Sequence, residues 1–266
     1  MIICPLLSGS SGNATYVASG STRILIDAGA SGASLEANLR EIGVDPSDLT
    51  HILVTHAHDD HIRGVGVMSR RYGLPLYASE GVWTEMTRGA RIGRVPTRFM
   101  KVFCSTRRQT LHLGDVDVDY FSTPHDAYDS VGYVVSDGDV KFGIATDFGF
   151  VTPSIRQSLS PCDAVLLEAN YDYDMLWNGP YPYLLKQRVA GPRGHLDNRD
   201  AGQFAAELAR QRARYIYLGH LSEHNNTQRL AYDAVKKCFD ESELELEKDC
   251  FVYMTRRYKP SRLLVL

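Results

Sequence analysis

The sequence predicts an α/β protein in which two β-sheets face each other and helices cover their outer sides. Segments rich in β-branched residues, typical of strands, come first and then alternate with segments of helical periodicity. A similar order recurs after about residue 110, as expected if two layered halves pack together. Turn residues separate the segments, but no low-complexity linker divides the chain. We therefore expect one domain over residues 1–266.

The first half is expected to begin with three strands, because SGSSGN and SGS between them have turn chemistry. These strands are expected at 2–7, 14–18 and 22–27. The elements that follow are a helix at 34–42, a strand at 51–54, a helix at 65–72, a strand at 76–78 and a helix at 81–88.

The second half is expected to begin at residues 116–121, where apolar and acidic side chains alternate as in a half-exposed strand. The turn signal Asp137-Gly138-Asp139 predicts a hairpin between strands at 131–135 and 141–145. The later elements are a strand at 164–168, a helix at 201–210 capped by Asp197 or Asn198, a strand at 215–218 and a helix at 228–239.

The composition is that of an ordinary globular protein, with 44% hydrophobic and 23% charged residues. The N-terminal run MIICPLLSGSSGN lacks the basic region of a signal peptide, and no apolar run approaches the ~18 residues of a membrane helix. The five cysteines are widely spaced, which favours reduced thiols and a cytoplasmic location. We expect no membrane partner, and both a monomer and a dimer stay open.

A net charge of −3 argues against a simple nucleic-acid-binding protein, but the average hides a basic stretch. Between residues 88 and 108 there are seven basic side chains and no acidic one. They are Arg88, Arg91, Arg94, Arg98, Lys101, Arg107 and Arg108. Arginine contacts to phosphates would bind nucleic acid without regard to sequence, and Phe99 and Phe103 could stack on unpaired bases. A solvated loop is the alternative.

Residues 55–61 read THAHDDH, a concentration of imidazole and carboxylate that predicts a metal site. In extended backbone His56, His58 and Asp60 lie two apart and point the same way, whereas His61 turns to the other side. Such a loop can serve two metals. Nitrogen and oxygen ligands suit zinc, manganese or iron rather than a thiolate site. The alternative is that this segment is a polar surface loop that binds no metal.

Further ligand candidates stand just after predicted strands. They are His125, Asp147 and His220, each one to four residues beyond a strand end, and Asp27, similarly placed at the end of RILIDAG. Any one of them alone is more simply a cap or a surface residue. Their joint occurrence favours a site built from loops along one edge of the sheets.

With these residues in order, the chain resembles the metallo-β-lactamase superfamily, whose hallmark is HxHxDH. The resemblance implies a four-layer αββα sandwich with two divalent metal ions. It assigns His56, His58 and His125 to one metal. It assigns the other metal to Asp60, His61 and His220, with Asp147 as the bridge and Asp27 behind the ligands. Asp147 stands where several class B β-lactamases carry a cysteine, and this pattern is closer to the ribonuclease Z-like and glyoxalase II branches.

Four further motifs resemble the YycJ/WalJ group of that superfamily. They are SGSSGN at 8–13, ILVTHAHDDHIRG at 52–64, GHLDN at 194–198 and GHLSEHNN at 219–226. The resemblance implies a 5′-to-3′ exonuclease, with DNA favoured as the partner. Asp197 departs from the serine expected in GHLSN, and a carboxylate near phosphate is unfavourable unless it caps the following helix.

The expected chemistry is a phosphodiesterase reaction. Two metals would lower the pKa of a bridging water toward ~7 and offset charge on the phosphate oxygens. The candidate catalytic residues are Asp60, Asp27 and His195, of which His195 would bind the scissile phosphate or protonate the leaving oxygen. His195 could instead belong to a capping loop. Glu168 would orient a histidine or form a plain salt bridge.

Substrate contacts are expected from residues outside the ligand set. The candidates are His195, Arg91, Arg94, Arg98, Ser222 and Asn225. Ser222 and Asn225 could equally cap the last helix, while Lys186, Arg188 and Arg193 would extend the positive surface. Two other functions stay open, namely a small-molecule hydrolase of cyclic phosphodiesters or thioesters, and a metal-binding protein without catalysis. Only 46 residues follow His220, which disfavours a glyoxalase II with its helical C-terminal domain.

Overall fold

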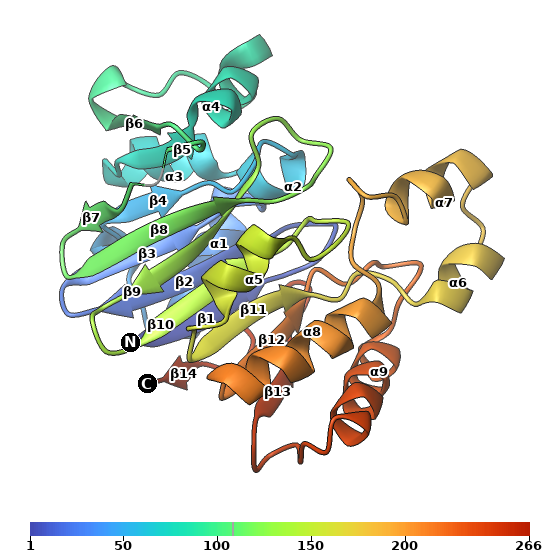
Figure 1. Cartoon of the computed structure of the whole chain (residues 1–266). Helices are drawn as coiled ribbons and strands as arrows, with labels where there is room; N and C mark the ends of the chain where they lie inside the picture. The colour runs from blue at the N-terminus through green and yellow to red at the C-terminus, as the bar shows by residue number, and fades with distance from the viewer. Residues whose placement is uncertain (108) are drawn as a thin grey trace.

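The chain folds into two mixed β-sheets that lie face to face between layers of helices (Figure 1). The computed structural model describes residues 1–107 and 109–266, so Arg108 of the basic stretch lies outside the described residues. Within this described part each sheet has seven strands. The predicted α/β sandwich with four αββα layers is thereby confirmed.

The first sheet is formed mainly by the N-terminal half of the chain. Its strand order is β14-β1-β2-β3-β4-β5-β6, antiparallel up to β3 and parallel from β3 to β6. The bounds are β1 (Ile2–Leu7), β2 (Ala14–Ser19), β3 (Thr22–Ile26), β4 (His51–Leu53), β5 (Leu76–Ser79), β6 (Met100–Phe103) and β14 (Leu264–Val265).

The second sheet has the order β13-β12-β11-β10-β9-β8-β7, antiparallel from β7 to β10 and parallel from β10 to β13. The predicted hairpin is present, with Lys141 of β10 opposite Ser136 of β9. The bounds are β7 (Leu111–Leu113), β8 (Val116–Ser122), β9 (Val131–Ser136), β10 (Lys141–Ala145), β11 (Ala164–Glu168), β12 (Tyr215–Gly219) and β13 (Phe251–Met254).

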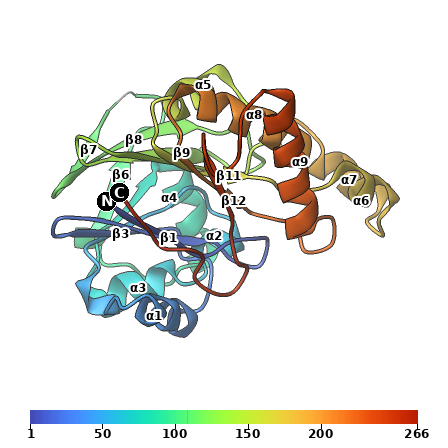
Figure 2. The same cartoon turned by 90° about the horizontal axis from the view of Figure 1, so that it is seen from below.

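Helices cover the outer face of each sheet (Figures 1 and 2). The first sheet is covered by α1 (Gly32–Glu41), α3 (Val65–Tyr72) and α4 (Glu80–Thr87), and α2 (Asp59–Ile62) lies at its edge. The second sheet is covered by α5 (Pro153–Leu159), α8 (Asn198–Gln211) and α9 (Gln228–Glu241). Two short helices, α6 (Tyr173–Asn178) and α7 (Tyr183–Val189), project from the body.

Strand periodicity sorts the apolar side chains into three buried layers. Successive residues of a strand point to opposite faces. On β3, Leu25 packs under the helices, whereas its neighbours Ile24 and Ile26 enter the layer between the sheets. On β11, Val165 packs under helices and Leu166 packs between the sheets. Each sheet is therefore buried on both faces, which fixes the register of the strands that carry the site.

Local capping explains where most helices begin. Ser31 accepts a hydrogen bond from the Ser34 backbone N–H, so α1 starts two residues earlier than predicted. Asp197 accepts from the Asp200 N–H and is the N-cap of α8, which confirms that predicted role. The sequence pattern missed α6 and α7, because each is too short to show a helical period. Among the described residues no helix is long and apolar enough to cross a membrane.

Candidate metal centre

Three side chains of the site stand in left-handed backbone conformation just after a strand. Asp27 follows β3 with φ of 60°, Asp147 follows β10 with φ of 62°, and His220 follows β12 with φ of 54°. Residues other than glycine rarely adopt this conformation, and where they do it commonly marks a functional position. The turn lifts each side chain off its strand and aims it along one edge of the sandwich.

One group of three histidines gathers at this edge. His56 and His58 come from the loop after β4, and His125 comes from the loop after β8. The ring centroid of His56 is 4.8 Å from that of His58 and 5.0 Å from that of His125. His58 Nδ1 lies 3.3 Å from His125 Nε2. One nitrogen of each ring lies within 4.8 Å of the other two, a spacing at which they could hold one ion.

A second group combines Asp60, His61 and His220. Asp60 Oδ2 lies 3.4 Å from His220 Nε2 and 3.6 Å from His61 Nε2. His61 and His220 are buried, whereas Asp60 is partly open to the cavity described below. The ligand atoms of these three residues also lie within 4.8 Å of one another. The histidine and aspartate groups are therefore suited to binding divalent metal ions.

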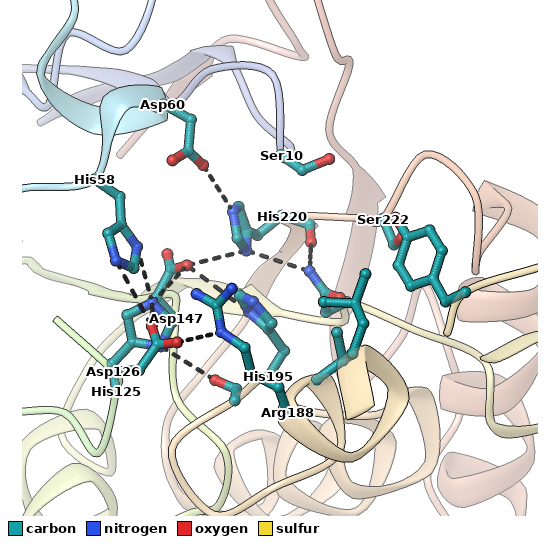
Figure 3. Close-up of a pocket in the computed structure, with 15 residues that line it drawn as sticks. Ser10, His58, Asp60, His125, Asp126, Asp147, Arg188, His195, His220 and Ser222 are labelled. Atoms are coloured by element: carbon teal, nitrogen blue, oxygen red, sulfur yellow. Dashed lines mark hydrogen bonds and ion pairs between the residues drawn. The ribbon is translucent and has the colours of Figure 1, made fainter. Parts of the chain in front are cut away.

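Asp147 stands between the two groups and faces both (Figure 3). Its Oδ2 lies 3.3 Å from His61 Nε2, and its Oδ1 lies 3.6 Å from His125 Nε2 and 3.5 Å from His220 Nδ1. The side chain is 2% exposed. This carboxylate therefore lies beside histidines of both groups, as a ligand shared between two metal ions would.

The ligand candidates are held from behind by fixed acceptors. His61 Nδ1 donates to Asp27 Oδ2 at 2.7 Å, and Asp27 also accepts from the backbone N–H and hydroxyl of Thr55. His125 Nδ1 donates to the carbonyl of Gly194 at 3.2 Å. Such bonds set the tautomer of each ring and leave Nε2 free to bind metal. The structure thus brings Asp27 into contact with a ligand candidate rather than with the cavity.

Glu168 joins His220 to His195 at the end of β11. Its Oε1 accepts from His220 Nδ1 and from His195 Nδ1, both at 2.8 Å. Its Oε2 accepts from the backbone N–H groups of Phe148 and Leu196. All four contacts hold one fully buried carboxylate in place. His195 is itself 22% exposed at the cavity wall, so it is oriented by protein on one side and open to a ligand on the other.

The histidines of the cluster fall into two kinds, those whose pKa is lowered and those whose pKa is raised. Burial lowers the pKa of His56 and His125 below the usual histidine range. Burial also disfavours charge on His61, but Asp27, Asp147 and Asp60 outweigh it and raise the pKa of His61 well above that range. For His195, burial is likewise opposed by Glu168, which raises the pKa of His195.

Two buried polar atoms test whether metal ions fit this site. Within the described residues, His56 Nε2 and Asp147 Oδ2 are shielded from solvent and make no hydrogen bond of good geometry. Buried polar atoms are nearly always satisfied, so an orphaned pair points to an unrecorded partner such as an ion. Both atoms belong to one ligand group, with His61, that could hold a metal. The donor set therefore fits divalent cations bound by imidazole and carboxylate.

A cavity of about 350 Å³ opens over this cluster. Its wall includes His58, Asp60, His125, Asp147, His195, His220 and Ser222. Asn225, a predicted substrate contact, is fully buried and absent from the described lining. Its side chain contacts the Ser222 hydroxyl instead, so it supports the wall rather than forming it.

Several residues of the site lie outside the predicted set. Asn13 Nδ2 donates to Asp60 Oδ2 at 3.2 Å, and this asparagine closes the SGSSGN motif, which was the available signal. Asp126 lies 3.6 Å from His58 Nε2 and accepts from Arg188 Nε at 2.6 Å. Arg188 and Tyr181 line the cavity from the α6–α7 region, where no sequence pattern indicated a role beyond added positive charge.

The basic stretch lies at the surface beside the metal centre. Arg91 Nη2 pairs with Asp59 Oδ1 at 2.7 Å, which anchors the stretch next to His58 and Asp60. Arg94 and Arg98 are exposed but are not part of the described cavity wall. The expectation that Phe103 stacks on bases is wrong, because its ring is 5% exposed and packs against Tyr120 between the sheets.

The fold and this cluster define the class of protein to which the chain belongs. The family described as the beta-lactamase superfamily domain matches residues 22–220. The chain is similar to exodeoxyribonuclease WalJ of Streptococcus pneumoniae, with 38% identity over 94% of this chain and 92% of that protein. It is 36% identical to exodeoxyribonuclease YycJ of Bacillus anthracis over 89% of this chain and 88% of that protein. The chain therefore belongs to the WalJ/YycJ group of the metallo-β-lactamase superfamily.

A solved structure agrees with this assignment at the level of the fold. The metallo-β-lactamase fold protein YhfI from Bacillus subtilis superposes with a TM-score of 0.72 over 100% of both chains, at 16% identity. The layered arrangement described above is thus that of an experimentally known fold.

Proposed function

We propose that this chain is a metal-dependent exodeoxyribonuclease with a dinuclear centre. The observation that carries this proposal is that the Asp147 carboxylate lies within 3.6 Å of histidines from both groups of ligand candidates. In this proposal His56, His58 and His125 would hold one metal. Asp60, His61 and His220 would hold the other, and Asp147 would contribute to both. Zinc or manganese suits these nitrogen and oxygen donors, and iron is also compatible.

Divalent ions at such a centre act as Lewis acids toward phosphate oxygens and lower the pKa of bound water. The chain's own residues supply the rest. Asp27 and Glu168 hold His61 and His220 in fixed orientations, so the ligands need no rearrangement when substrate arrives. Asp60, open to the cavity and held by Asn13, orients the attacking water.

His195 is the proposed group for the leaving oxygen. Its Nδ1 is bonded to Glu168 and its ring borders the cavity, so Nε2 is available to a phosphate or a leaving sugar oxygen. Glu168 raises the pKa of His195, which favours the protonated ring that a general acid needs. Ser222, in another part of the same wall, is proposed as a hydrogen-bonding contact to substrate.

DNA is the proposed substrate because both curated relatives named above are called exodeoxyribonucleases. Cleavage from the 5′ end is part of the same proposal and rests on the motif resemblance alone. The basic stretch supports a polyanionic substrate, since Arg91 is anchored beside the centre and its neighbours are exposed.

The deciding experiment loads the purified chain with Mn²⁺ or Zn²⁺ and incubates it with end-labelled single- and double-stranded DNA and RNA. A nuclease of the proposed kind releases mononucleotides from the 5′ end of DNA, and chelation abolishes the release. Bis(p-nitrophenyl) phosphate is tested beside the polymers. Hydrolysis of this diester with intact DNA would favour a small-molecule hydrolase, and inertness toward all substrates would favour a metal-binding protein without catalysis.

A further inference from the structure

The region between β11 and α8 forms an arm that stands away from the rest of the molecule (Figures 1 and 2). We define the α6–α7 arm as residues 171–193. It exposes large side chains that a folded protein normally covers: Leu184 is 78% exposed, Tyr183 64% and Tyr173 62%. Exposed apolar and aromatic side chains concentrated in one element indicate a binding surface.

The arm is internally ordered although it is short. The Trp177 ring centroid lies 6.1 Å from that of Tyr173 and 6.2 Å from that of Tyr183. Lys186 Nζ donates to the Trp177 carbonyl at 2.7 Å and so ties α7 to α6. Gln187 Nε2 donates to the Tyr183 hydroxyl. These contacts hold the exposed rings in place before any partner arrives, which lowers the entropic cost of binding.

One side of the arm is continuous with the metal centre. Tyr181, Leu185 and Arg188 form part of the cavity wall, and the arm is tied to the catalytic loops by the ion pair of Arg188 with Asp126. The exposed Tyr183 and Leu184 lie next to these wall residues in the chain. A ligand that extends out of the cavity past Tyr181 therefore meets them next.

The charge and ring content of the arm point to one kind of partner. The arm carries three cations, Lys186, Arg188 and Arg193, and its two acids, Asp172 and Asp174, both lie at its N-terminal end. The same segment holds Trp177, Tyr181 and Tyr183. Cations interleaved with aromatic rings are the arrangement that binds single-stranded nucleic acid, in which phosphates are neutralised and bases stack on rings. Bases of a duplex are already stacked on each other and offer no free face.

A second copy of this chain fits the arm less well. A stable protein interface buries roughly 800 Å² per partner from about 20–30 residues a side. The whole arm has 23 residues, of which α6 and α7 contribute only six and seven. The cations Lys186, Arg188 and Arg193 of the arm also outnumber its acids, Asp172 and Asp174, so a symmetric contact would bring like charges together.

We propose that the α6–α7 arm binds an unpaired DNA strand, with bases packed on Tyr183 and Leu184, and guides its end into the cavity past Tyr181 and Arg188. The inference rests on the proposed nuclease function. It adds that the polymer is held as a single strand, by a segment distinct from the basic stretch that Arg91 anchors.

The test measures binding by fluorescence anisotropy with a labelled oligothymidylate of about 12 nucleotides, a length within the site sizes of single-strand binders. The full-length protein is used in chelator, so the readout needs no hydrolysis. Tyr183→Ala with Leu184→Ala should weaken binding by about 5- to 150-fold, the range that one base–aromatic stack is worth. Tyr183→Phe keeps the ring and should bind as wild type does. The control Tyr258→Ala removes an equally exposed tyrosine, at 62%, that is not in the described cavity wall.

Leu184→Glu is a second variant for the case in which the double variant fails to fold. It adds a negative charge at a side chain that is 78% exposed, and it should also weaken binding of the single strand. Equal affinities of wild type, double variant and Leu184→Glu would overturn the inference. So would a dimer in light scattering that becomes a monomer on substitution, because the arm would then bind a second copy. The nuclease proposal is tested separately: it fails if the metal-loaded wild-type protein does not hydrolyse DNA.

Discussion

At the scale of single residues, the metal centre is defined by what stands behind each ligand candidate. His61 is backed by Asp27, His125 by the Gly194 carbonyl and His220 by Glu168. His58 has no such backing group in the described structure and is 35% exposed, with only Asp126 near its Nε2. It is therefore the ligand candidate whose removal disturbs the surrounding protein least.

We predict that His58→Ala lowers metal content and activity together while the fold survives. The substitution removes one of the three nitrogens of the histidine group, and the buried His125 Nε2 that faces His58 Nδ1 still has Asp147 Oδ1 at 3.6 Å. The measurement is elemental analysis with circular dichroism, and His112→Ala, at a side chain 78% exposed outside the cluster, is the control. Wild-type protein without affinity for any divalent metal would refute the dinuclear proposal.

A second prediction at this scale concerns His195. His195→Ala should keep both metals and reduce the rate of phosphodiester hydrolysis by about 10²- to 10⁴-fold, the usual contribution of general acid catalysis. Its Nδ1 also lies 3.8 Å from Asp147 Oδ1, and the residue belongs to a fourth group of potential ligands with Glu168 and His220. If the variant loses one metal equivalent, His195 is a metal ligand rather than a general acid. If the rate is unchanged, His195 is a histidine of the capping loop without a catalytic role.

At the scale of elements, the strand and loop before the HAHDDH segment are fixed by a residue of the other sheet. Tyr133 of β9 is fully buried, and its hydroxyl donates to the Val54 carbonyl at 2.6 Å. Tyr133→Phe keeps the ring but leaves that carbonyl unpaired, which should cost about 1–3 kcal/mol of unfolding free energy. Urea denaturation measures the difference, with Tyr258→Phe at an exposed site as control. Equal midpoints in both variants would show that the bond contributes nothing.

The basic stretch is the second element whose role can be tested. The triple substitution of Arg91, Arg94 and Arg98 by alanine should weaken DNA binding, although the whole protein is acidic. For each phosphate that is no longer neutralised, the slope of log K against log salt should fall by about 0.7 to 0.9. The control removes three exposed cations of α9, Arg229, Lys236 and Lys237, and so makes the same change in net charge. Equal salt slopes in the two variants would show that the basic stretch does not contact the phosphates of the DNA.

At the scale of the whole molecule, one apolar layer is shared by both halves of the chain. Ile24 and Leu53 of the first sheet pack in the same cluster as Val118, Phe142 and other side chains of the second. Separating the halves would expose this layer to water, which is unfavourable by about 25 cal/mol for every Å² of apolar surface.

We therefore predict that the metal-free protein unfolds in one transition, as a single domain over residues 1–266 does. Tryptophan fluorescence and far-ultraviolet circular dichroism should give the same guanidinium midpoint. Trp83 reports on the first half and circular dichroism on both halves, so a Trp83 transition separated from the circular dichroism transition would show that the halves unfold independently.

The sequence predicted the sandwich, and it placed candidate residues just beyond strand ends that the structure brings together at one edge, because both features depend on short-range order. Strand periodicity marks where a strand ends, and His or Asp directly beyond it, as at Asp147 and His220, must lie at a sheet edge. It could not predict that Asn225 is buried, that Phe103 enters the interior, or that Arg188 reaches the cavity. Those placements depend on how loops and the α6–α7 arm pack against distant elements, and no local pattern encodes them.

The left-handed backbone at Asp27, Asp147 and His220 constrains which substitutions sequences of this family can accept at these three positions. Each such residue costs of order 1–3 kcal/mol relative to relaxed backbone, and glycine would remove most of that cost. Selection for a more stable chain and selection for hydrolysis therefore pull in opposite directions at these three positions. Glycine at Asp27 or His220 would, however, deprive His61 or Glu168 of a buried hydrogen-bond partner, so the neighbouring residue would have to change as well. In a lineage released from hydrolysis, each strained residue and its partner are therefore expected to be lost together.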